Sequence, residues 1–227
     1  MSYERRYNKR PGEAIAERGN RAVGQVFSFR LRIAGMNTLV AFEIGLVISC
    51  LVALFLMRRT YFPMNLFWAV GVVAIGMAAL LGAFVYGGIG VVKPYHSQIS
   101  AFAGSIGIAS FALAALGGAF ARQFHEAGWW IVLFAVTALI AVLLFDLWKL
   151  PETVRYGVVG ILALAAFYRL VTNAATGVFL LLGVVALVAG GLASEWIAGV
   201  AGMQRLNVFH LLMSLSVLSF GAFAAKE

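Results

Sequence analysis

Charged side chains are scarce in this chain, since Asp, Glu, Lys and Arg make up 11% of its 227 residues. A soluble globular domain carries roughly 25%, so the composition excludes an ordinary water-soluble domain. The single cysteine, Cys50, excludes an intrachain disulfide and leaves the redox compartment undetermined. Pro63, Pro94 and Pro151 fall in expected loops or at helix ends. The chain therefore has no pair of Pro-broken spans of the kind found in inverted-repeat transporters.

Histidine is also rare, and the three residues His96, His125 and His210 limit the cofactors that the chain can bind. A metal site needs several convergent ligands. We expect His96 in a cytoplasmic loop and His125 in an outer one, so only His96 could approach His210, with Glu43 or Asp146 completing a set. Bis-histidine haem is excluded because only His210 is expected inside a span, and the last span has no lysine for retinal. No cofactor is predicted, and His210 is the candidate metal ligand.

Long apolar runs dominate what the chain does contain, and hydrophobic residues make up 63% of it. Backbone N–H and C=O groups find no partners in lipid, so each run has to be a helix that satisfies its own hydrogen bonds. The expected spans are Thr38–Met57, Leu66–Gly88, Ser97–Ala121, Trp129–Leu147, Val154–Val171, Thr176–Trp196 and Leu206–Ala225. The sequence thus predicts an all-α integral membrane protein. Its seven-transmembrane-helix bundle occupies residues 38–227 and follows a tail of residues 1–37.

Basic residues predict the orientation of this bundle, because they are in excess on the cytoplasmic side of membrane proteins. Eight of the 17 basic residues precede Asn37. They are Arg5, Arg6, Lys9, Arg10, Arg18, Arg21, Arg30 and Arg32. With the tail in the cytoplasm, four more fall on that side, and five fall on the other. This favours a cytoplasmic N-terminus and a C-terminus on the opposite side.

The same eight residues make the tail a candidate for binding anionic lipid head groups, at about 1 kcal/mol per basic residue near the surface. Beside a membrane span this interpretation is favoured over nucleic acid. The tail does not resemble a cleavable signal peptide. A broken helix that begins at Pro11 and lies along the head groups is the expected structure, with a disordered tail as the alternative.

Small residues recur at helical spacing in two spans. Ser100, Gly104 and Gly107 follow one side of the third span, and Gly183 and Gly190 follow one side of the sixth. Small residues at such spacings allow helix backbones to approach closely. They indicate either packing inside the bundle or a docking face for a helix of another subunit.

Ionisable residues at membrane depth are costly, so each is a functional candidate. Glu43 is expected two turns inside the first span and His210 one turn inside the last, at a similar depth, where a hydrogen bond between them is reasonable. That bond could instead only hold the helix ring closed. Asp146, Glu195 and Arg169 are expected at span ends, reaching water. No Ser-His-acid spacing marks a nucleophile, so the catalytic candidates are His210, Glu43 and Asp146.

Aromatic residues are expected at head-group depth. Tyr61, Phe62, Phe67, Trp68, Trp129 and Trp130 would mark one membrane interface, and Trp148 and Trp196 the other.

One run in the last span resembles a known family. The residues from Asn207 to Ser214, which include His210, resemble the last helix of the seven-helix intramembrane hydrolases, a superfamily that includes alkaline ceramidases and progestin/adiponectin-type receptors. In that superfamily a serine, an aspartate and three histidines bind zinc, so the resemblance implies hydrolysis of lipid-like substrates. It covers about one helix in seven. Ser214 stands where the family has a second histidine, and no Ser-x-x-x-His is found in the second or third span.

Three functions remain open from the sequence. The first is a non-catalytic subunit or scaffold of a larger membrane complex, of a bioenergetic or photosynthetic kind, with other membrane subunits as partners. The second is a zinc-dependent intramembrane hydrolase. The third is a small-molecule or ion transporter, in which Glu43 would be the coupling group. The richness in Gly and Ala, with few lysines, favours a bacterial inner membrane.

Overall fold

The computed structural model describes residues 38–120 and 151–226, with scattered helical positions between 128 and 142. The chain divides into two units, Met1–Thr38 and Leu39–Glu227, and the helices below lie in the second unit, apart from Thr38. The eight basic residues of the tail lie outside the described residues. So do His125, Asp146 and most of the predicted span Trp129–Leu147.

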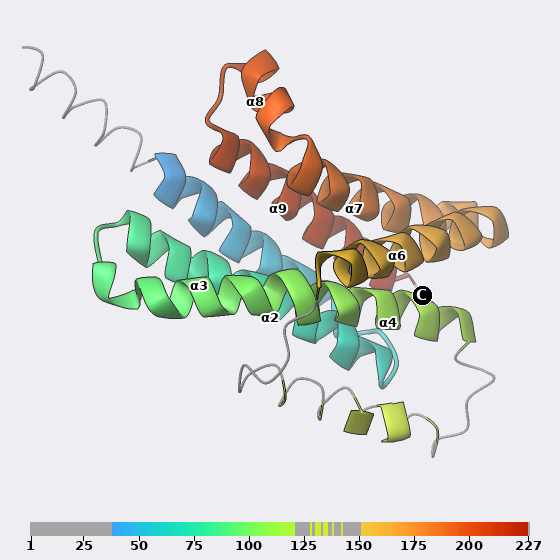
Figure 1. Cartoon of the computed structure of the whole chain (residues 1–227). Helices are drawn as coiled ribbons and strands as arrows, with labels where there is room; N and C mark the ends of the chain where they lie inside the picture. Colours follow the sequence, from blue (N-terminus) through green and yellow to red (C-terminus); the bar gives the residue numbers. More distant parts are fainter. Residues whose placement is uncertain are drawn as a thin grey trace, which may run out of the picture. The chain divides into compact units, whose positions relative to one another are not determined.

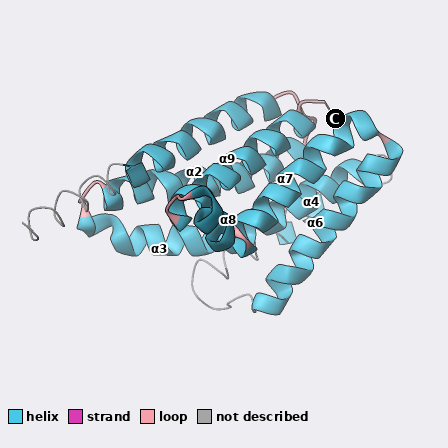
Figure 2. Cartoon of the chain, turned by 90° about the horizontal axis from the view of Figure 1, so that it is seen from above, coloured by secondary structure: helices cyan, strands magenta, loops and turns pink. Residues whose placement is uncertain are grey.

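Six of the described helices are long and apolar enough to cross a membrane (Figure 1). They are Thr38–Met57, α2 (Met64–Tyr86), the continuous helical segment Gly90–Gly118, α6 (Glu152–Thr172), α7 (Ala174–Leu192) and α9 (Arg205–Ala224). Each overlaps a span predicted from the sequence. A helix of about 20 residues is about 30 Å long, which matches the hydrocarbon core of a bilayer. Within the described residues the fold contains helices and loops only (Figure 2).

The third span begins earlier than predicted and changes its helical geometry. It starts with the 3₁₀ turn Gly90–Val92, continues as α3 (Lys93–Phe102), widens into a π-helical turn over Ala103–Gly107 and ends as α4 (Ile108–Phe120). The predicted start at Ser97 is wrong, because the polar residues before it extend the helix toward the head-group region. Pro94 lies in the first turn of α3, where a missing N–H leaves no hydrogen bond unmade.

The sixth span ends earlier than predicted. Trp196 lies on a separate short helix, α8 (Ser194–Ala201), and not on α7. The α8 helix ends at Gly202, whose φ of 63° is a left-handed conformation that glycine adopts without strain. Trp196 is 73% exposed, as expected for a tryptophan at a membrane interface.

Close approaches between helices define their relative directions. Between α2 and the first helix, Gly76 meets Cys50 and Gly82 meets Glu43. Between the first helix and α9, Ala53 meets Gly221 and Glu43 meets His210. Between α7 and α9, Gly183 meets Phe220 and Gly190 meets Leu212. Residue numbers increase in the same direction along both helices only for the pairs between the first helix and α9. The first helix is therefore parallel to α9 and antiparallel to α2, and α7 is antiparallel to α9.

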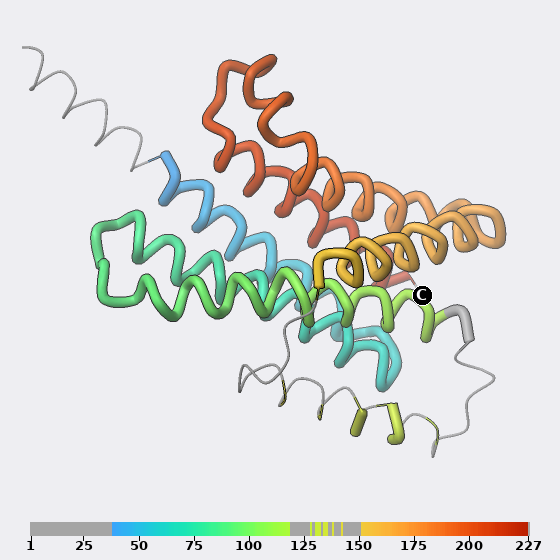
Figure 3. The backbone as a smooth tube through the Cα atoms, viewed as in Figure 1, coloured from blue at the N-terminus to red at the C-terminus, as the bar shows by residue number. Residues whose placement is uncertain are grey.

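The helices α4 and α6 run in the same direction (Figure 3). Segment α3–α4 is antiparallel to α2, since His96 contacts Ala78 and Phe111 lies against Gly71. The short turn at Asn173 joins α6 to α7 as a hairpin. Because α6 is antiparallel to α7 and α7 is antiparallel to α9, α6 is parallel to α9. It is therefore also parallel to the first helix and to α4.

An aromatic cluster forms the core at the level of Trp68. Its ring lies 5.5 to 5.9 Å from the rings of Phe111, Phe220 and Phe223, at the spacing of favourable aromatic pairs. Trp68 is fully buried and Phe67 is 2% exposed. The expectation that these two residues mark a membrane interface is therefore wrong, because they face the other helices. Position along a span predicts depth in the membrane but does not predict which face of the helix points inward.

Candidate functional site

A cavity of about 520 Å³ lies between the first helix, α2, the α3–α4 segment, α6, α7 and α9. Most of its lining is aliphatic. The polar lining residues are Glu43, Tyr86, His96, Ser100, Glu152, Arg155, Tyr156 and His210. Small-molecule sites in proteins have volumes of roughly 300–1,000 Å³ and combine apolar walls with a few polar groups. The cavity has the size and lining of such a site.

The most buried polar contact in the wall of this cavity joins Glu43 and His210. The imidazole Nε2 of His210 lies 3.2 Å from Oε1 of Glu43. The exposed fractions are 2% for Glu43 and 6% for His210. With Glu43 ionised, Nε2 has to carry the proton and donate it, because a carboxylate only accepts hydrogen bonds. The structure thus brings together the two candidates that the sequence placed at similar depth on the first and last spans.

Each partner keeps one buried polar atom without a hydrogen bond among the described residues. These atoms are Oε2 of Glu43 and Nδ1 of His210. Buried polar atoms are nearly always paired, and exceptions commonly reflect a functional role or a bound water or ion. Both atoms are acceptors when His210 is neutral with its proton on Nε2. The pair therefore has spare acceptor capacity beside a cavity.

Gly82 on α2 makes the space for the Glu43 carboxylate. A Cβ added at Gly82 would overlap Oε1 of Glu43 and would lie 2.7 Å from Cδ. The carboxyl group therefore packs directly on the α2 backbone. This contact positions Glu43 toward His210, and sequence reasoning did not identify it. The available signal was a row of residues at helical spacing on α2, namely Ile75, Ala78, Ala79, Gly82 and Tyr86, all of which lie on this side of the helix.

His96 and Tyr86 form a second polar group in the cavity wall. The Nδ1 of His96 lies 3.0 Å from the carbonyl oxygen of Ala78. Because a carbonyl oxygen only accepts, Nδ1 carries the proton and Nε2 of a neutral His96 is left as an acceptor. The Ser100 hydroxyl lies 3.5 Å from the same Nδ1. The Tyr86 ring meets the His96 ring edge-on, with centroids 6.3 Å apart.

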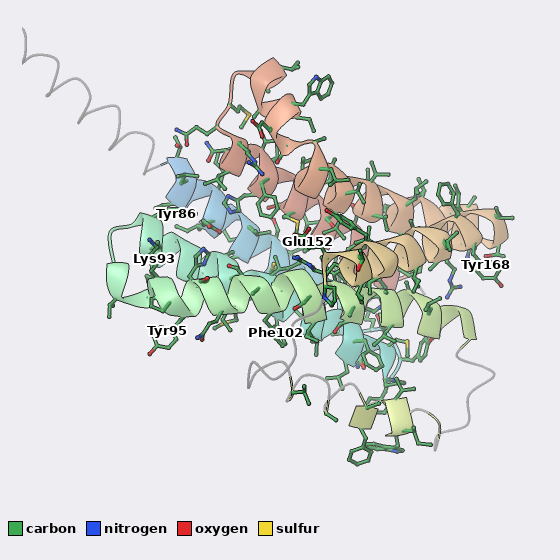
Figure 4. The ribbon with its side chains drawn as sticks, viewed as in Figure 1. Tyr86, Lys93, Tyr95, Phe102, Glu152 and Tyr168 are labelled. Atoms are coloured by element: carbon green, nitrogen blue, oxygen red, sulfur yellow. The ribbon has the colours of Figure 1, made fainter. Side chains whose placement is uncertain are left out.

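The first turn of α6 closes one side of the cavity with two charged residues. Arg155 and Glu152 form an ion pair of 3.4 Å, and their side chains are 44% and 76% exposed. Figure 4 places Glu152 at the start of α6, whereas Tyr168 lies near the far end of that helix and Tyr95 points away from the bundle. An ion pair at this exposure contributes little stability. Its position at the cavity is the notable feature, and the sequence did not reveal it because 31 residues separate α4 from α6.

Two of the remaining sequence candidates, Glu195 and Arg169, do not line the cavity. Glu195 forms an exposed pair of 3.6 Å with Arg205. The Arg169 guanidinium lies 5.8 Å from the centre of the Phe223 ring. Asp146 is outside the described residues.

The small residues proposed for helix packing have different surroundings. Gly107 lies against the α2 backbone at Gly71, Gly183 lies against the Phe220 ring, and Gly190 lies near Leu212. Ser100 and Gly104 line the cavity.

A metal site was expected to need a third ligand beside His210. Within residues 38–118 and 151–226 no group of three His, Cys, Asp or Glu side chains is arranged to hold a metal ion. His96 and His210 line the same cavity, but no third ligand converges with them. The described residues therefore provide His210 and Glu43 and not the complete ligand set implied by the resemblance to the intramembrane hydrolases.

Comparison with known proteins identifies no relative, since no family model, no curated protein and no solved structure matches this chain.

Proposed function

We propose that this protein binds a small molecule within the membrane and transports it, with Glu43 as the group that couples transport to protons. The buried Glu43–His210 pair in the wall of the central cavity carries the proposal. A structural ion pair needs no cavity beside it, whereas a coupling group in the cavity wall can respond directly to the bound molecule.

The chemistry of the pair suits proton coupling. An ionisable group at membrane depth is costly and is retained where it serves a pathway or a proton relay. Together, the carboxylate of Glu43 and the imidazole of His210 can take up one proton while they stay hydrogen-bonded. The loss or gain of that proton changes the charge of the cavity wall, and a ligand that binds one charge state more strongly becomes linked to the proton.

Transport is tested with the purified protein in liposomes that contain a pH-sensitive dye. A panel of small organic cations, anions and neutral molecules is added outside, and the internal pH is followed. We expect at least one class to drive a pH change in the wild type, and we expect Glu43→Gln to abolish it. The control is Glu195→Gln, because Glu195 is exposed, outside the cavity and paired with Arg205. A pH change that persists in Glu43→Gln contradicts the coupling role.

A second candidate function is a subunit of a larger membrane complex, and the exposure of α6 favours it. Only 17% of the residues in the apolar segment of this span are buried, the lowest share among the six candidate spans, whereas the share in α9 is 56%. Large apolar side chains such as Leu164 and Val171 are 70% and 86% exposed. Lipid chains can cover such a face, and so can a helix of another subunit.

Native mass spectrometry after gentle solubilisation from the protein's own membrane distinguishes lipid from a helix of another subunit on the α6 face. A subunit is expected to carry partner chains in fixed stoichiometry, and Leu164→Trp is expected to release them. Leu51→Trp is the matched control, because Leu51 is 61% exposed on the first helix. Release of the partners by removal of the tail before Asn37 would identify the basic tail as a second contact. A protein that carries only lipid contradicts this function.

The finer topology also belongs to this proposal. Seven spans, a cytoplasmic N-terminus and a bacterial inner membrane with anionic lipid at the basic tail together form one consistent arrangement. The common direction of α4 and α6 supports an odd number of crossings between them, since the chain has to return before it can enter α6 in the same direction as α4. The predicted span Trp129–Leu147 has the composition for that crossing.

A further inference from the structure

We infer that the ligand of the central cavity is a protonated amine with a compact apolar body. The inference rests on the proposed function, because it assigns a substrate class to the same cavity. It depends on three properties of the lining, namely the polar atoms that lack partners, the placement of charge and the size of the apolar walls.

Glu43, His210 and His96 each leave a hydrogen-bond acceptor in the cavity wall. Glu43 donates nothing when ionised and retains an unpartnered Oε2. His210 donates through Nε2 to Glu43, which leaves its unpartnered Nδ1 as an acceptor in the neutral ring. His96 donates through Nδ1 to Ala78, which leaves Nε2 as an acceptor. A complementary ligand has to supply hydrogen-bond donors, and an ammonium group supplies three without accepting any.

The charges around the cavity favour the same ligand. Glu43 is a buried acid whose partner His210 is a cation only when it is protonated, whereas Arg155, the one Lys or Arg among the described lining residues, is paired with Glu152 in the exposed first turn of α6. A buried charge is costly unless it is compensated. A cationic ligand compensates Glu43 directly, and an anionic ligand would place two like charges in one wall.

The apolar lining sets the body of the ligand. Leu46, Ile75, Ile108, Leu187 and Met213 contribute side chains from five different helical segments. Phe209 and Tyr86 add aromatic rings, which also attract cations. The volume of about 520 Å³ admits a ring system of drug-like size. A bare ammonium ion or a metal cation would leave these walls unused.

The test uses three probes of nearly equal shape, namely adamantylamine, adamantanol and adamantanecarboxylate. Their binding to the full chain in lipid nanodiscs is measured by calorimetry near neutral pH, with empty nanodiscs subtracted. We expect the amine to bind at least about tenfold more tightly than the alcohol or the carboxylate, a ratio that corresponds to about 1.4 kcal/mol. The preference is expected to disappear in Glu43→Gln and to persist in Glu195→Gln.

A second variant keeps the test valid if Glu43→Gln does not fold. Gly104 lines the cavity, and a Cβ added there would meet nothing within 4 Å. Gly104→Leu is expected to fill part of the cavity and to weaken binding of the amine while Glu43 and His210 stay unchanged. Amine binding that is unaffected by both variants places the probe elsewhere and overturns the inference.

The outcomes separate the ligand class from the function. If the alcohol or the carboxylate binds as tightly as the amine, or if no probe binds, the amine class is overturned. The transport proposal is then still decided by the liposome panel, in which anions and neutral molecules are present. If the amine binds selectively but no compound moves protons, the ligand class stands and the protein is a binding protein without transport.

Discussion

The Glu43 carboxylate of the first helix lies directly against the α2 backbone at Gly82, in a space that a single methyl group would fill. The contact explains how a long, flexible acid is held toward His210 at membrane depth. A substitution at Gly82 on the neighbouring helix would therefore alter the site without contacting a ligand.

We therefore expect Gly82→Ala to displace the carboxylate and weaken its contact with His210. The atoms that the added Cβ would meet are the end of the flexible Glu43 side chain, which borders the cavity and can move aside, so we expect the free energy of unfolding to fall only modestly and the binding of the amine probe to weaken clearly. The measurement is an unfolding titration in mixed detergent micelles, combined with the binding assay for the amine probe. Gly45→Ala is the control, because a Cβ at Gly45 meets nothing within 4 Å. Equal stability and binding in Gly82→Ala and Gly45→Ala would show that the contact is unimportant.

The Glu43–His210 pair should behave as a coupled unit. Removal of one partner from a buried pair leaves the other uncompensated, at a cost of about 3–5 kcal/mol. We expect Glu43→Ala and His210→Ala each to destabilise the protein strongly, and the double variant to be little worse than either. A double-mutant cycle should therefore give a coupling energy close to the cost of one single variant, about 3 kcal/mol, at the upper end of the range for residues in contact.

The exposed pair of Glu195 and Arg205 provides the reference cycle. Its side chains are 83% and 63% exposed, and such pairs couple by about 1 kcal/mol or less. Coupling in the buried pair that is no larger than in this surface pair would refute the assignment of Glu43 and His210 as a unit.

The contact between α7 and α9 depends on Gly183. An added Cβ there would overlap the Phe220 ring, and the Gly183 carbonyl oxygen accepts a hydrogen bond of 2.8 Å from the Ser216 hydroxyl. We expect Gly183→Ala to lower the free energy of unfolding by about 1–3 kcal/mol and Ser216→Ala by about 0.6 kcal/mol. Neither change touches Glu43, so binding of the amine probe by the folded fraction should be retained.

Gly157→Ala on α6 is the matched control for Gly183→Ala. A Cβ at Gly157 meets nothing within 4 Å, and alanine is the better helix former. We expect stability to stay equal or to rise slightly. A loss as large as that in Gly183→Ala would mean that helix geometry, and not the contact with Phe220, controls the result.

The sequence predicted the spans well because a bilayer imposes one dominant rule, the burial of backbone polar groups in long apolar helices. The first span, Thr38–Met57, has the predicted bounds, and the bounds of the other five described spans shift by one to seven residues. The sequence also indicated Glu43 and His210, because ionisable residues are conspicuous in such spans.

Sequence reasoning was less able to find the rest of the site, for a physical reason. Nearly every residue of a membrane helix is apolar, so hydropathy does not distinguish the face toward lipid from the face toward neighbouring helices. Trp68 was assigned to an interface for this reason, although it is buried in the core. Gly82 and Arg155 were not recognised as parts of the site, because the packing of α2 brings Gly82 to Glu43 and the packing of α6 brings Arg155 to the cavity, and no local motif marks either residue.

The direction of the helices leads to a prediction of topology that can be measured in cells. Gly90 begins the third span and Asn173 joins α6 to α7, so the two positions lie at opposite ends of the bundle. The native Cys50 is buried and can be replaced by alanine to give a background without thiols. With the N-terminus in the cytoplasm, a cysteine at Asn173 should react with a membrane-impermeant thiol reagent in intact cells. A cysteine at Gly90 should react only after the cells are permeabilised. Reversed labelling would show that the orientation is the opposite one, with the same arrangement of helices in the bundle. Labelling of both positions in intact cells would exclude a membrane-spanning arrangement of α2 and the α3–α4 segment, and with it the transport proposal.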